Sequence, residues 1–194
     1  MNRSAADHPQ QPASTTPATP AGTDPVGPAS SADPVDAIAA QWRRERPDLA
    51  AQTEAMAAFG RIYRIARAMG ERAEQAYAPY GIGRGEFDVL ATLRRAGDPY
   101  TLSPRELTAT LMLTTGGMTG RLDKLERAGL IARSPDPHDR RGLRVTLTAT
   151  GLEVVDRAAA AGMHVQQGVM AALGPADAAE LNRLLRALLA AAED

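Results

Sequence analysis

Two charged residues lie at positions where the surrounding pattern predicts apolar side chains. Arg121 follows Met118 by three residues, which places it close to the buried face of a predicted helix. A guanidinium there needs an acidic partner or a bound anion, because burying an unpaired charge is unfavourable. Asp88, within the otherwise apolar stretch 87–90, is the obvious partner, and Arg133 is a candidate for a second positive charge. These residues predict either a structural ion pair or a binding site for a small anion.

A different chemistry is indicated by small residues at the start of the same helix. Its first turns present small hydroxyl groups and bare backbone, contributed by Thr115, Gly116, Gly117, Thr119 and Gly120. Glycine weakens a helix by about 1 kcal/mol relative to alanine, so its repeated use indicates a need for close approach. Such a surface can lie against base edges in a DNA major groove. The alternative is that Gly116 and Gly117 belong only to the connecting turn.

Basic residues gather at the tip of the predicted hairpin that follows this helix. Arg140 and Arg141 lie there, and Asp139 is placed to orient one of them. A guanidinium at a hairpin tip can enter a DNA minor groove, although such a tip by itself is usually a solvated turn. Residues 101–145 contain eight basic and five acidic side chains, a net +3, whereas the whole chain carries −1. The positive charge is therefore concentrated around the predicted DNA-binding segment.

The composition argues against several other kinds of site. The chain has no cysteine, so disulfides and thiolate metal sites are excluded. Its histidines, at positions 8, 138 and 164, are too scattered to suggest a metal site. The glycines of 81–85 follow a predicted helix and lack the preceding strand of a dinucleotide-binding motif. With no recognisable nucleophile and base, we expect no enzymatic activity, no cofactor and no metal.

The ends of the chain and its hydropathy bear on location and order. Residues 1–34 contain seven of the fourteen prolines and no periodic apolar residues, which predicts a disordered tail. No apolar run is long enough to cross a bilayer, and the N-terminus lacks the pattern of an export signal. We therefore expect a cytoplasmic protein with one domain over 35–194.

The elements that must position the candidate residues follow from periodicity and from capping residues. We expect an extra N-terminal helix at 35–46, dimerisation helices at 50–78 and 149–192, and a DNA-binding lobe at 85–148. The terminal helices are too apolar to remain unpartnered, which predicts a homodimer.

The expected lobe has the layout helix, turn, helix and hairpin. Ser103 and Glu106 form a capping-box pattern that starts the first of these helices. Gly129 ends the second, and strands are expected at 130–134 and 143–148. The fold class is therefore mainly α with a small β-hairpin wing: a winged helix-turn-helix with N- and C-terminal dimerisation helices.

Three stretches together resemble the MarR family of winged helix-turn-helix transcriptional regulators. They are the helix segment 107–111, the run MTGRLDKLE at 118–126, and the signature DxRxxxVxLT at 139–148. The resemblance covers roughly residues 50–192. It implies a homodimeric regulator that binds a pseudo-palindromic DNA operator, with Arg141 in the minor groove.

A narrower resemblance connects the chain to the urate-responsive, PecS-like branch of that family. Trp42, Asp88, Arg121 and Arg133 match the residues that form the ligand pocket of that branch. The resemblance implies that a planar anion such as urate or a related purine stacks on Trp42, binds both arginines and hydrogen-bonds Asp88. It also implies a repressor that its ligand releases from the operator.

Other interpretations of these four residues stay open. The same pocket could respond to another aromatic or organic acid, such as a tricarboxylic acid. Trp42 could be a plain core residue, and Asp88 with Arg121 could be a structural ion pair in a DNA-binding protein without a ligand.

Overall fold

The computed structural model describes residues 32–111, 115–137, 139 and 142–193. Its elements are, in chain order, α1 (Pro34–Glu45), η1 (Pro47–Gln52), α2 (Thr53–Tyr77), η2 (Ala78–Tyr80), α3 (Arg84–Arg95), β1 (Thr101–Leu102), α4 (Pro104–Leu111), α5 (Thr115–Arg127), β2 (Ile131–Pro135), β3 (Leu143–Leu147), α6 (Ala149–Met170) and α7 (Pro175–Glu193). Within the described residues, no helix combines the length and apolar character that a membrane span requires. The mainly α fold class with a small sheet is confirmed.

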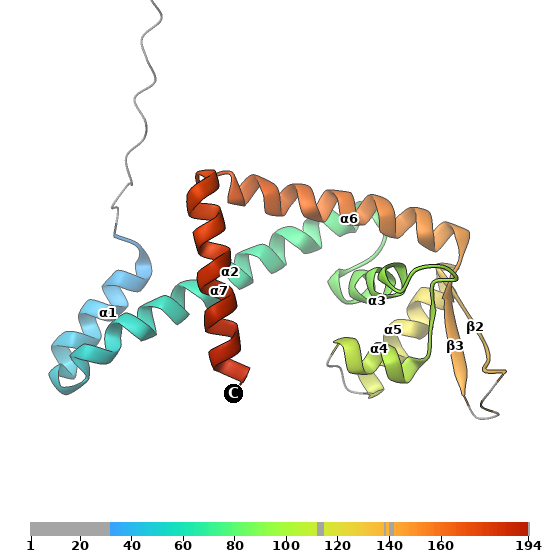
Figure 1. Cartoon of the computed structure of the whole chain (residues 1–194), viewed down its shortest axis with the longest axis horizontal. Helices are drawn as coiled ribbons and strands as arrows, with labels where there is room; N and C mark the ends of the chain where they lie inside the picture. Colours follow the sequence, from blue (N-terminus) through green and yellow to red (C-terminus); the bar gives the residue numbers. More distant parts are fainter. Residues whose placement is uncertain (1–31, 112–114, 138, 140–141, 194) are drawn as a thin grey trace, which may run out of the picture.

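Helices α3, α4 and α5 form a lobe with an antiparallel sheet of strand order β1-β3-β2 (Figure 1). The predicted capping box starts α4: the Glu106 amide donates to Ser103 Oγ (3.2 Å), and the Ser103 amide donates to the Glu106 carboxylate (2.7 Å). Gly129 follows α5 with a φ of 69°, which glycine adopts without strain. β2 and β3 then pair with Ile131 opposite Leu147, as expected for the wing hairpin.

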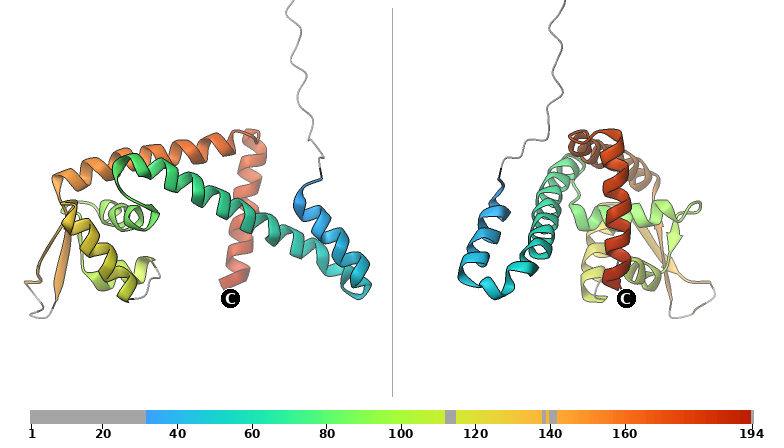
Figure 2. Two further views of the ribbon diagram at one scale, coloured as in Figure 1. Left: turned by 180° about the vertical axis from the view of Figure 1, so that it is seen from behind. Right: turned by 60° about the vertical axis from the view of Figure 1, so that its left-hand side comes forward.

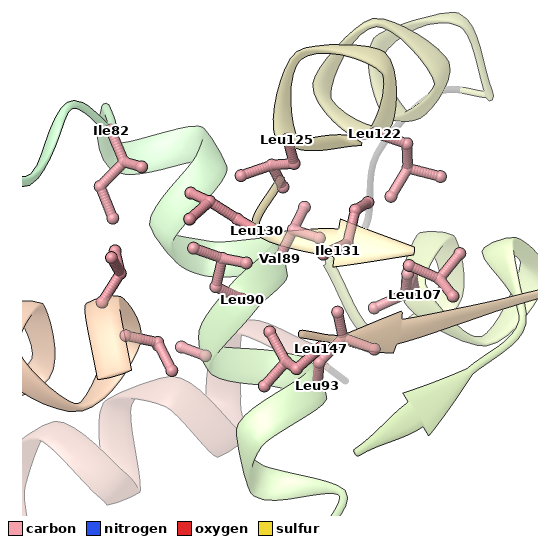
Figure 3. Packing of buried hydrophobic residues seen from close by; sticks show 14 of the residues in the cluster. Ile82, Val89, Leu90, Leu93, Leu107, Leu122, Leu125, Leu130, Ile131 and Leu147 are labelled. Atoms are coloured by element: carbon pink, nitrogen blue, oxygen red, sulfur yellow. The ribbon is translucent and has the colours of Figure 1, made fainter. Parts of the chain in front are cut away.

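One apolar core fixes α4 and α5 relative to α3. Val89, Leu90 and Leu93 of α3 are completely buried, and Leu107 of α4 and Leu125 of α5 pack into the same cluster. Figure 3 shows these side chains converging from several elements on the space beside α3. Helices α2 and α6 contribute to this core as well. The lobe is therefore continuous in its packing with the long helices.

The N-terminal helix α1 lies beside the first half of α2, at the end remote from the lobe (Figures 1 and 2). Asp33 caps it and accepts hydrogen bonds from the next backbone amides. Val35 is buried against Ala57 of α2. Arg61 of α2 adds ion pairs to Asp33 and Asp36, at 2.8 and 2.5 Å. Packing and charge both hold α1 on α2.

Much apolar surface of the long helices is exposed in the single protomer. Helix α7 turns away from the end of α6, as Figure 2 shows, and has no buried residue. The large exposed apolar residues on α1, α2, α6, α7 and the α6–α7 turn are Ile38, Trp42, Phe59, Tyr63, Ile65, Met163, Leu173, Leu184, Leu185, Leu188 and Leu189. Phe59 and Tyr63 lie on α2, in a segment expected to form a dimerisation helix, and the rest of the protomer does not bury them.

Two predictions fall partly on residues that the structure does not describe. The predicted disordered tail over 1–34 lies outside the described residues except for its last three, of which Asp33 and Pro34 begin α1. Within the wing, the residues predicted to contact DNA include Arg140 and Arg141, which also lie outside the described part of the chain.

Candidate functional site

Helix α5 presents one buried and one exposed face, and the exposed face holds the residues predicted to contact DNA. Met118 and Leu125 are buried in the core. Gly117, Thr119 and Gly120 are exposed, and a Cβ added to Gly120 would meet open space. Thr115 and Gly116 begin the same helix, but their side-chain surroundings lie outside the described residues. The described DNA-contact candidates of α5 thus lie on the face directed away from the core.

The wing continues from α5 through a single turn. Asp139, predicted to orient a wing arginine, is exposed at the hairpin tip. Arg144 lies near the tip end of β3, with its Nη1 atom 3.7 Å from the Glu106 carboxylate and 3.8 Å from that of Asp136. This contact ties the wing, close to its tip, to the start of α4.

Arg133 connects the first wing strand with α5. Its side chain is 19% exposed, and its Nη2 atom donates a hydrogen bond to the Asp123 carboxylate. Its Nε atom lies 3.0 Å from the Glu126 carboxylate, yet it is buried and makes no hydrogen bond, so this contact is an ion pair only. The two carboxylates, three residues apart, hold β2 against α5. Sequence analysis missed them because acidic residues on a helix face are usually only solvated.

Arg121 lies against the first turn of α3. A Cβ built on Gly85 would be 2.7 Å from Arg121 Nε, 2.8 Å from Cζ and 3.0 Å from Nη2. The guanidinium therefore occupies space that any other residue at position 85 would fill. In the part of the chain that the structure describes, Arg121 has no ion-pair partner, and the pair with Asp88 that the sequence suggested is not formed.

Asp88 lies one helical turn along α3, near Tyr77 at the end of α2. Burial raises the pKa of the Tyr77 phenol above its ordinary value, and the negative charge of Asp88 raises it further. The Tyr77 ring stacks on Phe87, with ring centroids 4.1 Å apart. Asp88 thus faces the junction of α2 and α3, while the Arg121 guanidinium of α5 lies against the first turn of α3.

A neighbouring pair also ties α3 to α5. The Gly83 amide donates to the Glu86 carboxylate at 2.9 Å, and Lys124 of α5 lies 3.2 Å from the same carboxylate. Burial opposes ionisation of Glu86, but the Gly83 amide and Lys124 outweigh it and lower its pKa. Charged contacts thus position α5 against both α3 and β2.

Trp42 lies far from the other three predicted ligand residues of the same protomer. It is on α1, is 46% exposed, and lines a small apolar hollow of about 310 Å³ with Leu49 and Met56 among its neighbours. Figure 1 shows α1 and α5 at opposite ends of α2. In one protomer Asp88 lies on α3, the Arg121 guanidinium of α5 lies against the first turn of α3, and Arg133 pairs with carboxylates on another side of α5. Trp42 of the same protomer is not near them.

A larger cavity that the sequence did not indicate lies between α4, α5 and the wing. Its volume is about 620 Å³, and its walls include Arg105, Met118, Leu122, Arg133 and Leu143. The walls are mostly apolar with two arginines, which suits an organic anion with a hydrophobic body. The cavity exists only because α4, α5 and the wing come together in the folded chain, which no local sequence pattern indicates.

Known proteins share this architecture and sequence. Residues 80–142 match the model of the MarR family. The chain is 34% identical over 151 residues to the HTH-type transcriptional regulator PecS of Dickeya dadantii, covering 78% of this chain and 90% of PecS. It is 30% identical over 133 residues to the multiple antibiotic resistance protein MarR of Escherichia coli, covering 68% of this chain and 90% of MarR.

Solved structures agree with these sequence relatives. A MarR family transcriptional regulator from Streptomyces coelicolor superposes with a TM-score of 0.62 at 28% identity, covering 73% of this chain and 96% of that chain. A mutant MarR from Escherichia coli complexed with operator DNA gives 0.60 at 27% identity, covering 76% and 97%. These relatives are regulators of transcription and not enzymes. The chain described here belongs to the MarR family of winged helix-turn-helix transcriptional regulators.

Proposed function

We propose that this regulator is a homodimeric repressor that binds a pseudo-palindromic DNA operator and is released by a small planar anion. The observation that carries DNA binding is the position of the exposed start of α5 beside the wing. The solved complex of a MarR mutant with operator DNA, which has the same fold, supports it. Thr115, Gly116, Gly117, Thr119 and Gly120 would approach the major groove. In the wing, Asp139 would orient Arg140 or Arg141 in the minor groove.

The exposed apolar face of the terminal helices supports the homodimer. Leu184, Leu185, Leu188 and Leu189 lie on one side of α7, where no residue of the same protomer buries them. A contiguous apolar surface of this kind usually marks an interface. Two copies would place one α5 each in successive major grooves, about 34 to 36 Å apart.

The ligand proposed first is urate or a related purine. The support is the uncompensated charge of Arg121, the second arginine at Arg133, and Asp88 as a hydrogen-bonding group on α3. Trp42 of the same protomer is remote, so the aromatic face would come from Trp42 of the partner subunit. An anion between α3 and α5 would pull on the helix that contacts DNA, and by linkage it would lower operator affinity.

A second candidate is the same regulator responding to another aromatic or organic acid. The cavity of about 620 Å³ between α4, α5 and the wing favours it, because Arg105 and Arg133 lie in otherwise apolar walls there. A ligand-independent DNA binder would leave the charge of Arg121 without a function, whereas Arg133 would keep its structural contacts with Asp123 and Glu126.

The test is a titration of a fluorescent operator duplex with the purified full chain, in the presence of urate, benzoate or citrate. We expect a dimer to bind the duplex and urate to weaken binding. Release by benzoate or citrate alone would favour the second candidate. A monomer that binds no fragment from its own genomic neighbourhood would overturn the proposed function.

A further inference from the structure

We propose that Gly85 is a positioning residue for the anion site. Because Gly85 has no side chain, the Arg121 guanidinium can lie directly against the backbone of α3, in a position called here the Gly85 seat. This inference rests on the proposed function, since it concerns how the same site holds its positive charge. The candidate site residues identified from the sequence do not include Gly85.

The geometry of the contact is face-on. The three guanidinium atoms nearest to the Cβ position of Gly85 lie at 2.7, 2.8 and 3.0 Å from it, almost equally far. The face of the guanidinium plane, not its edge, therefore lies toward the backbone of α3. In this orientation the N–H groups point sideways, where they can donate to a planar anion.

The charge so held is available for a ligand. Among the residues that the structure describes, no carboxylate pairs with Arg121, in contrast to Arg133 with its two carboxylates. Asp88 lies on α3, about one turn beyond Gly85, and offers an acceptor for a ligand N–H. A guanidinium that is fixed in place but unpaired would bind an anion without first breaking an ion pair or losing much side-chain entropy.

A methyl group at position 85 would displace the Arg121 guanidinium from the Gly85 seat without disturbing the fold. Real Cβ atoms essentially never come within 3.0 Å of another heavy atom, so the guanidinium would have to move. It is the far end of a flexible side chain, so it can do this cheaply. Alanine in place of glycine within a helix ordinarily stabilises the helix. Gly85→Ala is therefore expected to give a stable protein in which Arg121 is displaced.

The first part of the test measures, without ligand, the energetic coupling between position 85 and the Arg121 side chain. Urea unfolding midpoints are compared for Gly85→Ala in the wild-type and the Arg121→Ala backgrounds. We expect a clear gain in midpoint in the Arg121→Ala background and a smaller gain, or a loss, in the wild type. The control is Gly168→Ala in α6, where a Cβ meets nothing within 4 Å, and its effect should be equal in both backgrounds. Equal effects of Gly85→Ala in both backgrounds would overturn the proposal.

The second part measures the response to an anion. The urate concentration that releases half of the operator should rise at least about fivefold for Gly85→Ala, with operator affinity in the absence of urate unchanged. Gly168→Ala should respond as the wild type does. If urate releases the wild type and the Gly85→Ala variant equally well, the role of Gly85 is overturned but the proposed function stands. A wild type that responds to none of urate, benzoate and citrate would overturn the proposed function and this proposal with it.

Discussion

Arg133 and Asp123 join the wing to α5 by an ion pair whose partners are unequally buried. The arginine side chain is 19% exposed and that of the aspartate 46% exposed. Glu126, the second partner, is 44% exposed. Solvent can therefore stabilise either carboxylate without the arginine, but it cannot do the same for the guanidinium.

The first prediction is that removing the two carboxylate charges lowers the free energy of unfolding more than removing the arginine does. The double variant Asp123→Asn/Glu126→Gln leaves the guanidinium uncompensated and should lower the free energy of unfolding by about 1 to 3 kcal/mol. Arg133→Met fills similar space and removes the buried Nε donor, so its loss should be below about 1 kcal/mol. Urea unfolding measures both variants.

The control for that comparison is the exposed pair of Arg94 and Asp156, 2.8 Å apart. Asp156→Asn should change stability by less than about 1 kcal/mol. A larger loss for Arg133→Met than for the double variant would contradict the proposed asymmetry.

The second prediction concerns pH and Glu86. Its pKa in the folded state is lowered, so its ionisation stabilises the fold above its unfolded pKa of about 4.3 and ceases to do so as the pH falls through the folded value. Glu86→Gln keeps an acceptor for the Gly83 amide but loses the charge that faces Lys124. The stability gap between wild type and Glu86→Gln should be constant near neutral pH and should narrow below about pH 4.3. Glu153→Gln, at an exposed position, serves as the control and should show little gap at any pH.

The third prediction tests the wing. Arg141→Ala should weaken operator binding by about 1 to 3 kcal/mol if the side chain enters a groove. Dimerisation should be unchanged, because the wing tip is remote from the terminal helices. Arg44→Ala in α1 removes the same charge from an exposed ion pair and should leave the affinity close to that of the wild type. Fluorescence anisotropy at moderate salt distinguishes the two, and equal affinities would exclude a role for the wing arginine.

The fourth prediction tests the dimer surface. Leu184 is 50% exposed in the single protomer, and burial of a leucine in an interface contributes about 1.5 to 3 kcal/mol. Leu184→Glu should therefore raise the dimer dissociation constant by at least about tenfold, as measured by analytical ultracentrifugation. Ala190→Glu adds the same charge to an exposed position of α7 on the side opposite its leucine face and should leave the dimer intact. Equal weakening by both variants would show that charge, and not the leucine face, is responsible.

The sequence predicted the fold closely because its signals are local. Ser103 caps the helix that it was expected to cap, and Gly129 has the positive φ expected of a helix stop. The strand expected at 143–148 forms as β3 and pairs with β2 as expected of a hairpin. Such features depend on a few neighbouring residues and carry their own stereochemical reason.

The candidate site was harder to predict because it depends on where separate elements meet. Periodicity placed Arg121 near the core but could not show that its neighbour would be the backbone at Gly85 and not Asp88. It also gave no sign that Asp123 and Glu126 would hold Arg133. The distance from Trp42 to these residues depends on the length and direction of α2, which no local pattern contains.

The last prediction follows from that distance. If Trp42 completes the ligand pocket, it must come from the partner subunit, because α1 and α5 of one protomer lie at opposite ends of α2. Two inactive subunits should then complement one another. A dimer that joins a Trp42→Ala subunit to an Arg121→Met subunit contains one intact pocket, formed by Arg121 of the first and Trp42 of the second. If each pocket were formed within one subunit, that dimer would contain none.

The experiment uses co-expressed subunits with different tags, purified through both tags in sequence. Each variant homodimer should bind the operator but fail to release it with urate, whereas the mixed dimer should recover release at a urate concentration within about tenfold of the wild type. Methionine at position 121 keeps an unbranched, flexible side chain and removes the charged guanidinium with its N–H donors, so less packing beside α3 is lost than with alanine. The wild-type protein, carried through the same two-tag purification, gives the reference response. If urate releases the wild type but neither the mixed dimer nor the variant homodimers, each pocket is formed within one subunit. A fully responsive Trp42→Ala homodimer would instead remove Trp42 from the site, and its exposed ring would then belong to the dimer surface with Ile38 and Tyr63.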